Sequence, residues 1–370
     1  MKGTLKPHRY SKKTRIFTIV GSSVMAVLGV LCLTVAIVLT TMLGRIGFQG
    51  DTEYDPNADV DFGDEDSDIQ GEPVNPDDYD YAADVLELPV RGNEKGVRNI
   101  LLLGIDGTSY SGRSDTTMIL SINDNTKTIK LVSILRDTFV TIPGRDKDGD
   151  GKDDIGKFNA AYAYGRHTLQ NKTIERNFRL DIDDYIGVNF SSLPKVIDAL
   201  GGLDIYLTQK EMTQIPGYGC NVEIPIPGRT DDCGGANGFF SLKGEAGTYH
   251  LNGFQAMQYA RIRKLDSDFK RTQRQQKVIE LIMNKAKSMS YSQLVAVLYK
   301  ALDCVDTNMS SDEFLSFAAS AVTYFGYELK RDYSVPKAGE YKGATINGGA
   351  GLMLTDPKTV VKNLHQYLYG

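Results

Sequence analysis

Residues 16–44 most constrain the fold, because they carry no charged side chain between Arg15 and Arg45. The stretch exceeds the roughly 20 residues that a helix needs to cross the hydrocarbon core, so it predicts a single transmembrane helix. Residues 1–15 hold six Lys and Arg and no acid, and such a flank stays cytoplasmic. A cleavable signal peptide is the alternative, but it would have a shorter apolar stretch and a small-residue cleavage site, which the sequence lacks. We predict a cell-membrane protein with a cytoplasmic N-terminus and an extracytoplasmic remainder.

Residues 45–90 predict an acidic, disordered extracytoplasmic linker. Positions 51–90 contain fifteen Asp and Glu, four prolines and no base. Like charges repel one another and too little apolar surface is present to form a core. We therefore expect a spacer that holds the following domain off the bilayer. Binding of calcium or other wall cations by this stretch is the alternative.

Residues 91–370 predict one extracytoplasmic α/β domain. The apolar run Ile100–Ile105 is typical of a central strand buried on both faces. Further strands are expected at Thr117–Asn123 and Thr128–Leu135, and residues 181–210 show the order strand, helix, strand. Residues 291–330 indicate two helices, and a Gly-rich extended stretch follows before a closing helix from Asp356. This order favours a sheet with helices packed against it.

Two aspartates and an arginine follow or precede these strands. Asp106 ends the first strand and Asp115 begins the second, so the two carboxylates can face each other across the connecting loop. Such a pair beside a phosphate is how Mg²⁺ is usually held; turn and cap roles are the alternative. Arg136 directly follows the third strand, where open α/β sheets bind ligands, and Asp137 would orient it.

The stretch from His250 to Gln276 contains six Arg and Lys. Alternation over Gln258–Ile262 predicts a strand, which would place Arg261 and Arg263 on the same side. From Asp268 a helical period puts Asp268, Arg271 and Gln275 on one face. Guanidinium groups match phosphate oxygens in pairs, so the stretch predicts a phosphate or pyrophosphate site. A surface strand and helix with ordinary ion pairs is the alternative.

Asp146, Asp148 and Asp150, followed by Gly151, have the spacing of an EF-hand calcium loop. Lys157 replaces the closing Glu, and Asp153 or Asp154 would have to substitute. A structural Ca²⁺ site at Asp146, Asp148, Asp150 and Asp154 and an acidic surface hairpin both remain open.

Cys220 and Cys233 bracket a Gly- and Pro-rich insertion. An extracytoplasmic location allows a disulfide between them, which would contribute about 3 kcal/mol by the loop-entropy model. Cys304 is left over, and we expect it to be a buried helix residue.

Several function classes are excluded or disfavoured. The chain has four histidines, no G-x-S-x-G motif and no P-loop, so a nucleophilic hydrolase or P-loop enzyme is not indicated. Residues 91–370 hold 35 bases and 32 acids. Nucleic-acid binding is therefore not expected, given this balance and the predicted compartment.

The chain from Arg98 to Gly370 resembles the LytR-CpsA-Psr family of Gram-positive cell-wall proteins. The matching stretches are NILLLGID, GRSDTTM, SILRDT, KFNAAYAYG, DDYIGVNF, HLNGFQAMQYARIR and DFKRTQRQQ. The resemblance implies a central mixed β-sheet packed between helices. It also implies roles for particular residues: Asp106 and Asp115 would bind Mg²⁺ or Mn²⁺, Arg136, Arg261, Arg263, Arg271 and Gln275 would hold a pyrophosphate, and Arg113, Lys157 and Asp268 would support them. Many members carry an arginine shortly after the first Asp, where this chain has Gly107-Thr108.

The resemblance also implies an activity. Family members transfer a glycopolymer, such as teichoic acid or capsule, from a polyprenyl-pyrophosphate carrier to peptidoglycan, with Arg136, Asp106 and Asp115 expected at the centre of catalysis here. Two alternatives remain: a polyprenyl-pyrophosphate phosphatase that uses the same site with water, and a non-enzymatic envelope regulator or scaffold.

Overall fold

The computed structural model describes residues 47–48, 53–57, 69–76, 83–106, 110, 112–214, 245–262 and 265–370. The predicted transmembrane segment, residues 16–44, lies outside these ranges, as do Arg263, Cys220 and Cys233. Among the residues in these ranges, no helix combines the length and the apolar character that a membrane crossing requires.

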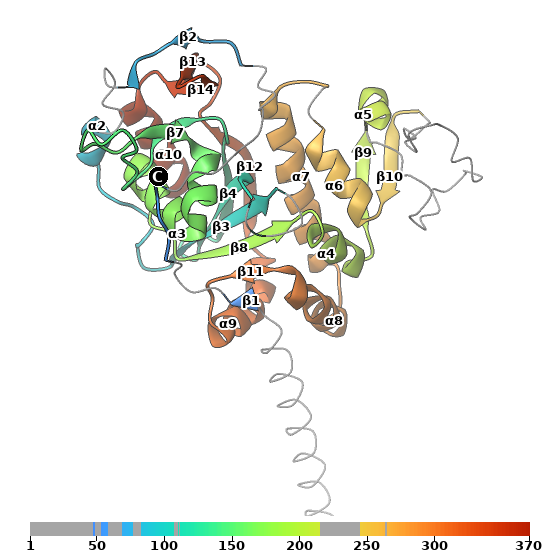
Figure 1. Ribbon diagram of the computed structural model, residues 1–370. Helices are drawn as coiled ribbons and strands as arrows, with labels where there is room; N and C mark the ends of the chain where they lie inside the picture. Colours follow the sequence, from blue (N-terminus) through green and yellow to red (C-terminus); the bar gives the residue numbers. More distant parts are fainter. Residues whose placement is uncertain are drawn as a thin grey trace, which may run out of the picture. The chain divides into compact units, whose positions relative to one another are not determined.

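Seven strands of the described residues form a mixed sheet in the order β1-β11-β8-β3-β4-β5-β12 (Figure 1). β3 (Val97–Ile105) lies in the middle, parallel to β8 (Asp184–Asn189) and antiparallel to β4 (Ser114–Asn123). β5 (Thr128–Ile134) pairs antiparallel with β4 and parallel with β12 (Glu328–Val335). The central place of β3 follows from its apolar run, because only a strand covered on both faces favours such a sequence. The predicted α/β fold with a central mixed sheet is confirmed. β12 falls partly in residues 291–330, where only helices were predicted.

One face of the sheet is covered by α3 (Phe158–Phe178) and α10 (Pro357–Tyr369), with α2 (Ala83–Leu86) beside them (Figure 1). Leu101, Leu103 and Ile119 on the sheet share a buried core with α3 and α10. α3 is interrupted where Gly165 and Arg166 leave helical geometry.

The other face is covered by α4 (Leu193–Ala199), α6 (Gly253–Arg261) and α7 (Asp268–Lys287). Leu102 and Met118, which pair in register, point to this side, as the period-two geometry of strands requires. The three helices pack with β9 (Leu203–Leu207), β10 (Gly247–Leu251) and α5 (Gln209–Gln214) around a second core. β9 and β10 pair with each other, apart from the main sheet.

Two smaller sheets complete the first side. β13 (Tyr341–Ile346) pairs with β14 (Gly349–Leu354) and with β2 (Glu72–Pro73). β6 (Phe139–Thr141) and β7 (Ile155–Lys157) form an antiparallel pair. The acidic loop lies between β6 and β7, and Lys157 ends β7.

The described parts of residues 45–90 contact the domain, where the sequence predicts a free spacer. β1 (Gly47–Phe48) adds to the edge of the main sheet, and β2 pairs with β13. Tyr54 packs against Gly165, where an added Cβ would lie 2.7 Å from the tyrosine ring, and Arg145 donates to the Pro56 carbonyl at 2.6 Å. The spacer prediction overlooked these contacts because each pairs a few local residues with partners far away in sequence.

α8 (Tyr291–Ala301), the short helix η2 (Leu302–Cys304), β11 (Asp306–Thr307) and α9 (Ser311–Tyr324) follow one another at one end of the main sheet (Figure 1). Ser310 and Glu313 form a capping box that begins α9. Cys304 is buried in η2, in agreement with the predicted packing role.

Candidate active site

The site is built around a chain of buried ion pairs. Arg136 Nη1 lies 2.9 Å from Asp115 Oδ1, and Arg136 Nε lies 3.2 Å from Asp137 Oδ2. Asp137 Oδ1 in turn lies 3.2 Å from Lys157 Nζ. The side chains of Arg136, Asp137 and Lys157 are 9%, 7% and 11% exposed, so solvent screens these pairs only weakly.

Strand register explains why Asp115 meets Arg136. β4 and β5 are antiparallel, with Thr117 opposite Ile134, so the start of β4 and the end of β5 lie at the same edge of the sheet. The β3–β4 ladder pairs Gly104 with Thr116 and Ile105 with Ser114. Asp115 is therefore the extra residue of a β-bulge, a feature that re-aims side chains beside functional sites.

The first turn of α7 connects to the same point. Arg271 Nη2 donates to the backbone carbonyl of Asp115 at 2.9 Å, while its Nη1 lies 3.0 Å from Asp268. Asp268, Arg271 and Gln275 lie on one helix face, as their spacing predicted. α7 thus brings a second buried guanidinium to the β4–β5 edge.

Arg261 reaches the site from a helix and not from a strand. Gln258–Ile262 was predicted to be extended, and this prediction is wrong: residues 253–261 form α6. Asn252 and Gln255 form a capping box at its start, a signal that outweighs a five-residue alternation. The Arg261 guanidinium lies over the Phe190 ring, 3.9 Å from the centroid, which orients it by a cation–π contact.

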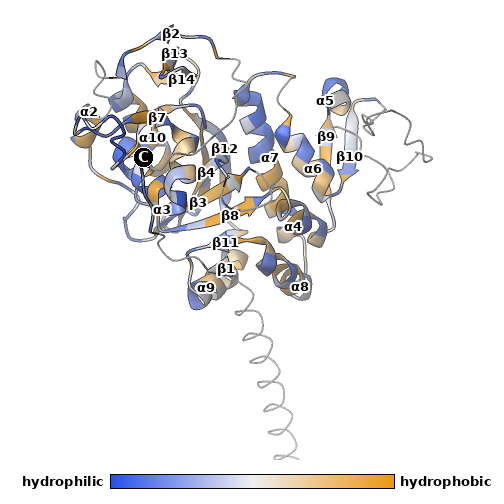
Figure 2. Cartoon of the chain, viewed as in Figure 1, coloured by the Kyte–Doolittle hydropathy of each residue, from blue (hydrophilic) through white to orange (hydrophobic). Residues whose placement is uncertain are grey.

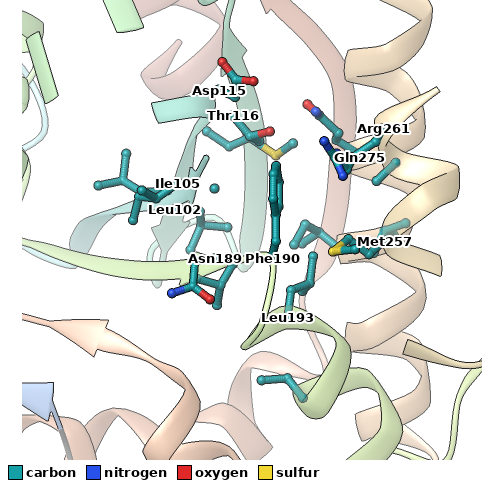
Figure 3. Close-up of a pocket in the computed structure, with 18 of the residues that line it drawn as sticks. Leu102, Ile105, Asp115, Thr116, Asn189, Phe190, Leu193, Met257, Arg261 and Gln275 are labelled. Atoms are coloured by element: carbon teal, nitrogen blue, oxygen red, sulfur yellow. The ribbon is translucent and has the colours of Figure 1, made fainter. Parts of the chain in front are cut away.

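An apolar pocket of about 530 Å³ adjoins this cluster, between β3, β4 and β8 on one side and α4, α6 and α7 on the other. Figure 3 shows Asp115, Arg261 and Gln275 at one end and Leu193 at the other. Arg271 also lines it. The hydrophobic residues of the lining are Leu102, Leu103, Ile105, Met118, Ile186, Val188, Phe190, Leu193, Val196, Met257, Ala260, Ile262, Val278, Ile279, Ile282 and Val305. A cavity that is apolar along its length and cationic at one end suits an amphiphile with an anionic head.

Asp115 and the neighbouring arginines stabilise each other's charged forms. Burial raises the pKa of Asp115, but Arg136 and Arg271 outweigh it and hold that pKa below its usual range. Burial lowers the pKa of Arg136, and Asp115 and Asp137 more than compensate, so it is raised. For Lys157 burial prevails over Asp137, and its pKa is lowered. Asp115 and Arg136 are therefore ionised at neutral pH, as an electrostatic site requires.

Asp106 and Arg113 stand at the two ends of the β3–β4 loop. The Asp106 backbone N–H donates to the Arg113 carbonyl at 2.9 Å, which closes the base of the loop. Arg113 also acts electrostatically on both Asp115 and Lys157. The two predicted metal ligands, Asp106 and Asp115, therefore each follow one residue of the last β3–β4 pair, Ile105 and Ser114. This all-oxygen donor set fits a hard cation.

Asp137 is the residue whose importance the sequence understated. It was expected only to orient Arg136, yet it is buried and lies between Arg136 and Lys157. The sequence signal was its position directly after Arg136 at a strand end. Its second partner, Lys157, could not be foreseen, because β6 and β7 must pair before Lys157 reaches it.

The predicted calcium loop keeps three of its four acids together. Carboxylate oxygens of Asp146, Asp148 and Asp150 lie within 4.8 Å of one another, and Asp146 accepts from the Gly151 N–H at 3.0 Å. Asp154 instead pairs with Arg145 at 3.4 Å. Binding of Ca²⁺ by this loop stays a prediction.

Comparison with known proteins identifies relatives of this chain. The model of the LytR_cpsA_psr family matches residues 65–347. The chain is 33% identical over 249 residues to the polyisoprenyl-teichoic acid–peptidoglycan teichoic acid transferase TagU of Enterococcus faecalis, covering 65% of this chain and 70% of that protein. It is 34% identical over 264 residues to TagU of Oceanobacillus iheyensis, covering 69% and 70%.

Solved structures of similar fold include a protein of the same kind as these relatives. The crystal structure of Bacillus subtilis TagT superposes with a TM-score of 0.54 at 25% identity, over 78% of this chain and 96% of that one. TagT bound to LIIa-WTA superposes with a TM-score of 0.55 at 25% identity, over 80% and 97%. The family model covers more than half of the chain, and the sequence motifs, the mixed sheet and the arginine site point the same way. The chain therefore belongs to the LytR-CpsA-Psr family.

Proposed function

We propose that this protein is a membrane-anchored extracytoplasmic transferase that moves an anionic cell-wall polymer from a polyprenyl-pyrophosphate carrier to peptidoglycan. The observation that carries the proposal is the apolar pocket with Asp115, Arg261, Arg271 and Gln275 at its lining. A polyprenyl chain matches the apolar length, and a pyrophosphate matches the guanidinium groups. The transferases TagU and TagT among the relatives support a teichoic acid as the polymer.

The reaction that fits this arrangement is phosphoryl transfer. A peptidoglycan hydroxyl attacks the phosphorus next to the polymer, a new P–O bond forms, and the P–O bond to the lipid phosphate breaks. The polymer is then held by a phosphodiester, lipid monophosphate leaves, and the hydroxyl proton passes to solvent or a nearby base. Arg136 and Arg271 would stabilise the negative charge that develops on the leaving phosphate. Asp137 pairs with the Nε of Arg136 and would orient its guanidinium group.

Asp106 and Asp115 would hold Mg²⁺ or Mn²⁺ together with pyrophosphate oxygens. When bound, the ion would supply Lewis-acid stabilisation of the phosphate charge. Ionised Asp115 is available as a ligand because its pKa is held low despite burial. In a thermal-shift titration, added Mg²⁺ should stabilise the wild-type chain more than Asp115→Asn. Equal stabilisation of both would remove Asp115 from the ligand set.

A second proposal concerns the acidic loop. Asp146, Asp148 and Asp150 could hold a structural Ca²⁺, with backbone and water oxygens completing the shell. Calorimetric titration of Ca²⁺ into wild type and Asp148→Asn tests this, and identical heats would leave the loop as an acidic surface hairpin.

The activity is tested with the full chain in detergent, a polyprenyl-pyrophosphate oligosaccharide, peptidoglycan oligomers and Mg²⁺. Mass spectrometry should detect a glycan–peptidoglycan adduct that carries the phosphate, together with lipid monophosphate. Release of lipid pyrophosphate would instead place the attack at the sugar carbon. Lipid phosphate without adduct would favour the phosphatase, and no turnover with lipid binding retained would favour the scaffold.

A matched pair of variants on α7 localises the effect. Arg271 is buried and contacts Asp115, whereas the adjacent Lys270 is exposed and contacts Gln273. Both Arg271→Gln and Lys270→Gln remove one positive charge. Arg271→Gln should lower turnover about 100-fold or more, as loss of a donor to a developing oxyanion does, and Lys270→Gln should stay within about threefold. Equal effects would contradict the proposed site.

A further inference from the structure

The helices α8 and α9 carry few charges for a water-facing part of the domain. They comprise 11 and 14 residues, and only Lys300, Asp312 and Glu313 among these are charged. The share is about half of the 24% found in the whole chain. Figure 2 shows hydrophobic segments on both helices.

Their exposed faces are apolar or weakly polar. On α8 the exposed positions Ser292, Ala296 and Tyr299 follow helical spacing, and Tyr299 is 38% exposed. On α9, after the first turn, the exposed positions among the side chains that the structure describes are Ser316, Ala319, Val322 and Thr323, and Val322 is 55% exposed. The exposed acids Asp312 and Glu313 lie in the first turn of α9, before these positions, and Asp303 is exposed in η2 between the two helices. Exposed helix faces with so few charges are candidates for an interaction surface.

The short length of chain between the predicted transmembrane segment and β1 limits how far β1 can lie from that segment. β1, Gly47–Phe48, pairs with β11, which lies between α8 and α9 in sequence. The predicted transmembrane segment ends at Gly44, so Arg45 and Ile46 alone separate it from β1. Three peptide steps reach at most about 11 Å. The remainder of the acidic stretch follows β1 and cannot act as a spacer between the bilayer and this edge of the sheet.

We propose that the exposed faces of α8 and α9 form a membrane-docking surface that rests in the headgroup region of the bilayer from which the chain emerges. The partner is the lipid surface itself. Tyr299 has the amphipathic ring that favours this depth, and Val322 provides apolar contact. The exposed Lys300 of α8 would face anionic headgroups. The proposal rests on the membrane anchor of the proposed function.

Docking there would join the lipid surface to the apolar pocket. Leu193 and Val196 of α4 line the pocket, and Val305 lines it one residue before β11. α4 packs against α8, so α8 lies next to the helix that forms one wall of the pocket. A polyprenyl tail could then pass from the bilayer to the pocket with little exposure to water. Such exposure would cost free energy in proportion to the apolar surface of the tail.

The absence of tryptophan from the sequence makes a direct test possible. Tyr299→Trp and Val322→Trp place a single fluorophore on α8 or α9 of the full chain, reconstituted into liposomes of phosphatidylcholine and phosphatidylglycerol. Leu86→Trp on α2 and Tyr206→Trp on β9 are the matched controls, because the replaced residues are 43% and 60% exposed. Brominated lipids should quench positions 299 and 322 at least about threefold more than positions 86 and 206.

Equal quenching at all four positions would overturn the proposal. A chain that fails to float with the liposomes would overturn it as well, because the anchor would then be missing. Turnover in detergent, measured on the same preparations, shows separately whether the transferase activity stands. Val322→Glu provides a functional check: it should slow turnover of liposome-embedded carrier about tenfold and leave a short-chain, water-soluble carrier unaffected. Equal rates for both carriers in this variant would count against docking.

Discussion

Replacement of Asp137 by Asn removes one charge from the centre of the buried network. The carboxylate lies 3.2 Å from both Arg136 Nε and Lys157 Nζ, and its side chain is 7% exposed. Asparagine keeps the shape of the side chain but not its charge. The variant therefore leaves two buried cations without the anion that lies between them.

The expected loss of stability follows from this geometry. Removal of one partner from a buried ion pair costs about 3–5 kcal/mol. Two features favour the lower end of that range. Arg136 keeps its contact with Asp115 at 2.9 Å. Burial already lowers the pKa of Lys157, and Asp137 raises it. The variant can therefore lose the unpaired buried charge by deprotonation of this lysine. At about 2 °C per kcal/mol for a domain of this size, we expect the melting temperature to fall by roughly 6 °C.

Turnover should fall as well, because Arg136 loses the group that orients it. Misplacement of a catalytic group by about 1 Å can cost roughly 100-fold, and we expect a loss of 10- to 100-fold in kcat. The difference in unfolding free energy between wild type and Asp137→Asn should shrink as the pH is raised, because neutral Lys157 no longer forms an ion pair with the carboxylate. A variant with a fixed structural defect would show no such pH dependence.

Thermal unfolding from pH 6 to pH 9, with turnover measured on the same samples, tests this prediction. Asp204→Asn is the control: Asp204 pairs with His250 at 2.7 Å, but the two side chains are 62% and 54% exposed. An exposed pair of this kind contributes at most about 1 kcal/mol, so its melting temperature should change by no more than about 2 °C. If Asp137→Asn behaved like Asp204→Asn in both assays, the reasoning would be refuted.

Three further predictions follow from single contacts. Phe190→Ala removes the ring under Arg261 and should weaken carrier binding about fivefold, the cost of one cation–π contact of about 1 kcal/mol; a carrier titration measures it, and unchanged affinity would contradict it. Val196→Trp should fill part of the pocket and raise KM for long-chain carriers more than for short ones, so equal changes would argue against a tail site there. Asp306→Asn should stabilise the protein at pH 7, because burial raises the pKa of Asp306 more than Tyr185 lowers it. That cost is present above the raised pKa and is relieved as pH falls through it. The difference in melting temperature between this variant and wild type should therefore vanish in acid, and a pH-independent difference would contradict the assignment.

Local sequence patterns predicted much of the fold. The run Ile100–Ile105 identified the central strand, the period from Asp268 identified α7, and Asp356 marked the start of α10. Short-range signals also misled: of the alternating stretch Gln258–Ile262, all but the last residue is helical in the structure, and β12 was overlooked. Five residues carry too little periodicity to decide between strand and helix. An edge strand such as β12 pairs only with one neighbour, β5, which lies far away in sequence.

By itself, the sequence determined the order of most helices and strands, the partition into an apolar segment, an acidic stretch and a mixed domain, and which side chains could bind an anion. Tertiary structure alone decided which of these charges meet. Asp115 reaches Arg136 through the β4–β5 register and a bulge, and Asp137 reaches Lys157 through the β6–β7 pair. Docking of β1 on β11 likewise joins positions about 260 residues apart. Periodicity reports on an element's own neighbours along the chain, whereas strand register and docking depend on contacts made only when distant segments pack together.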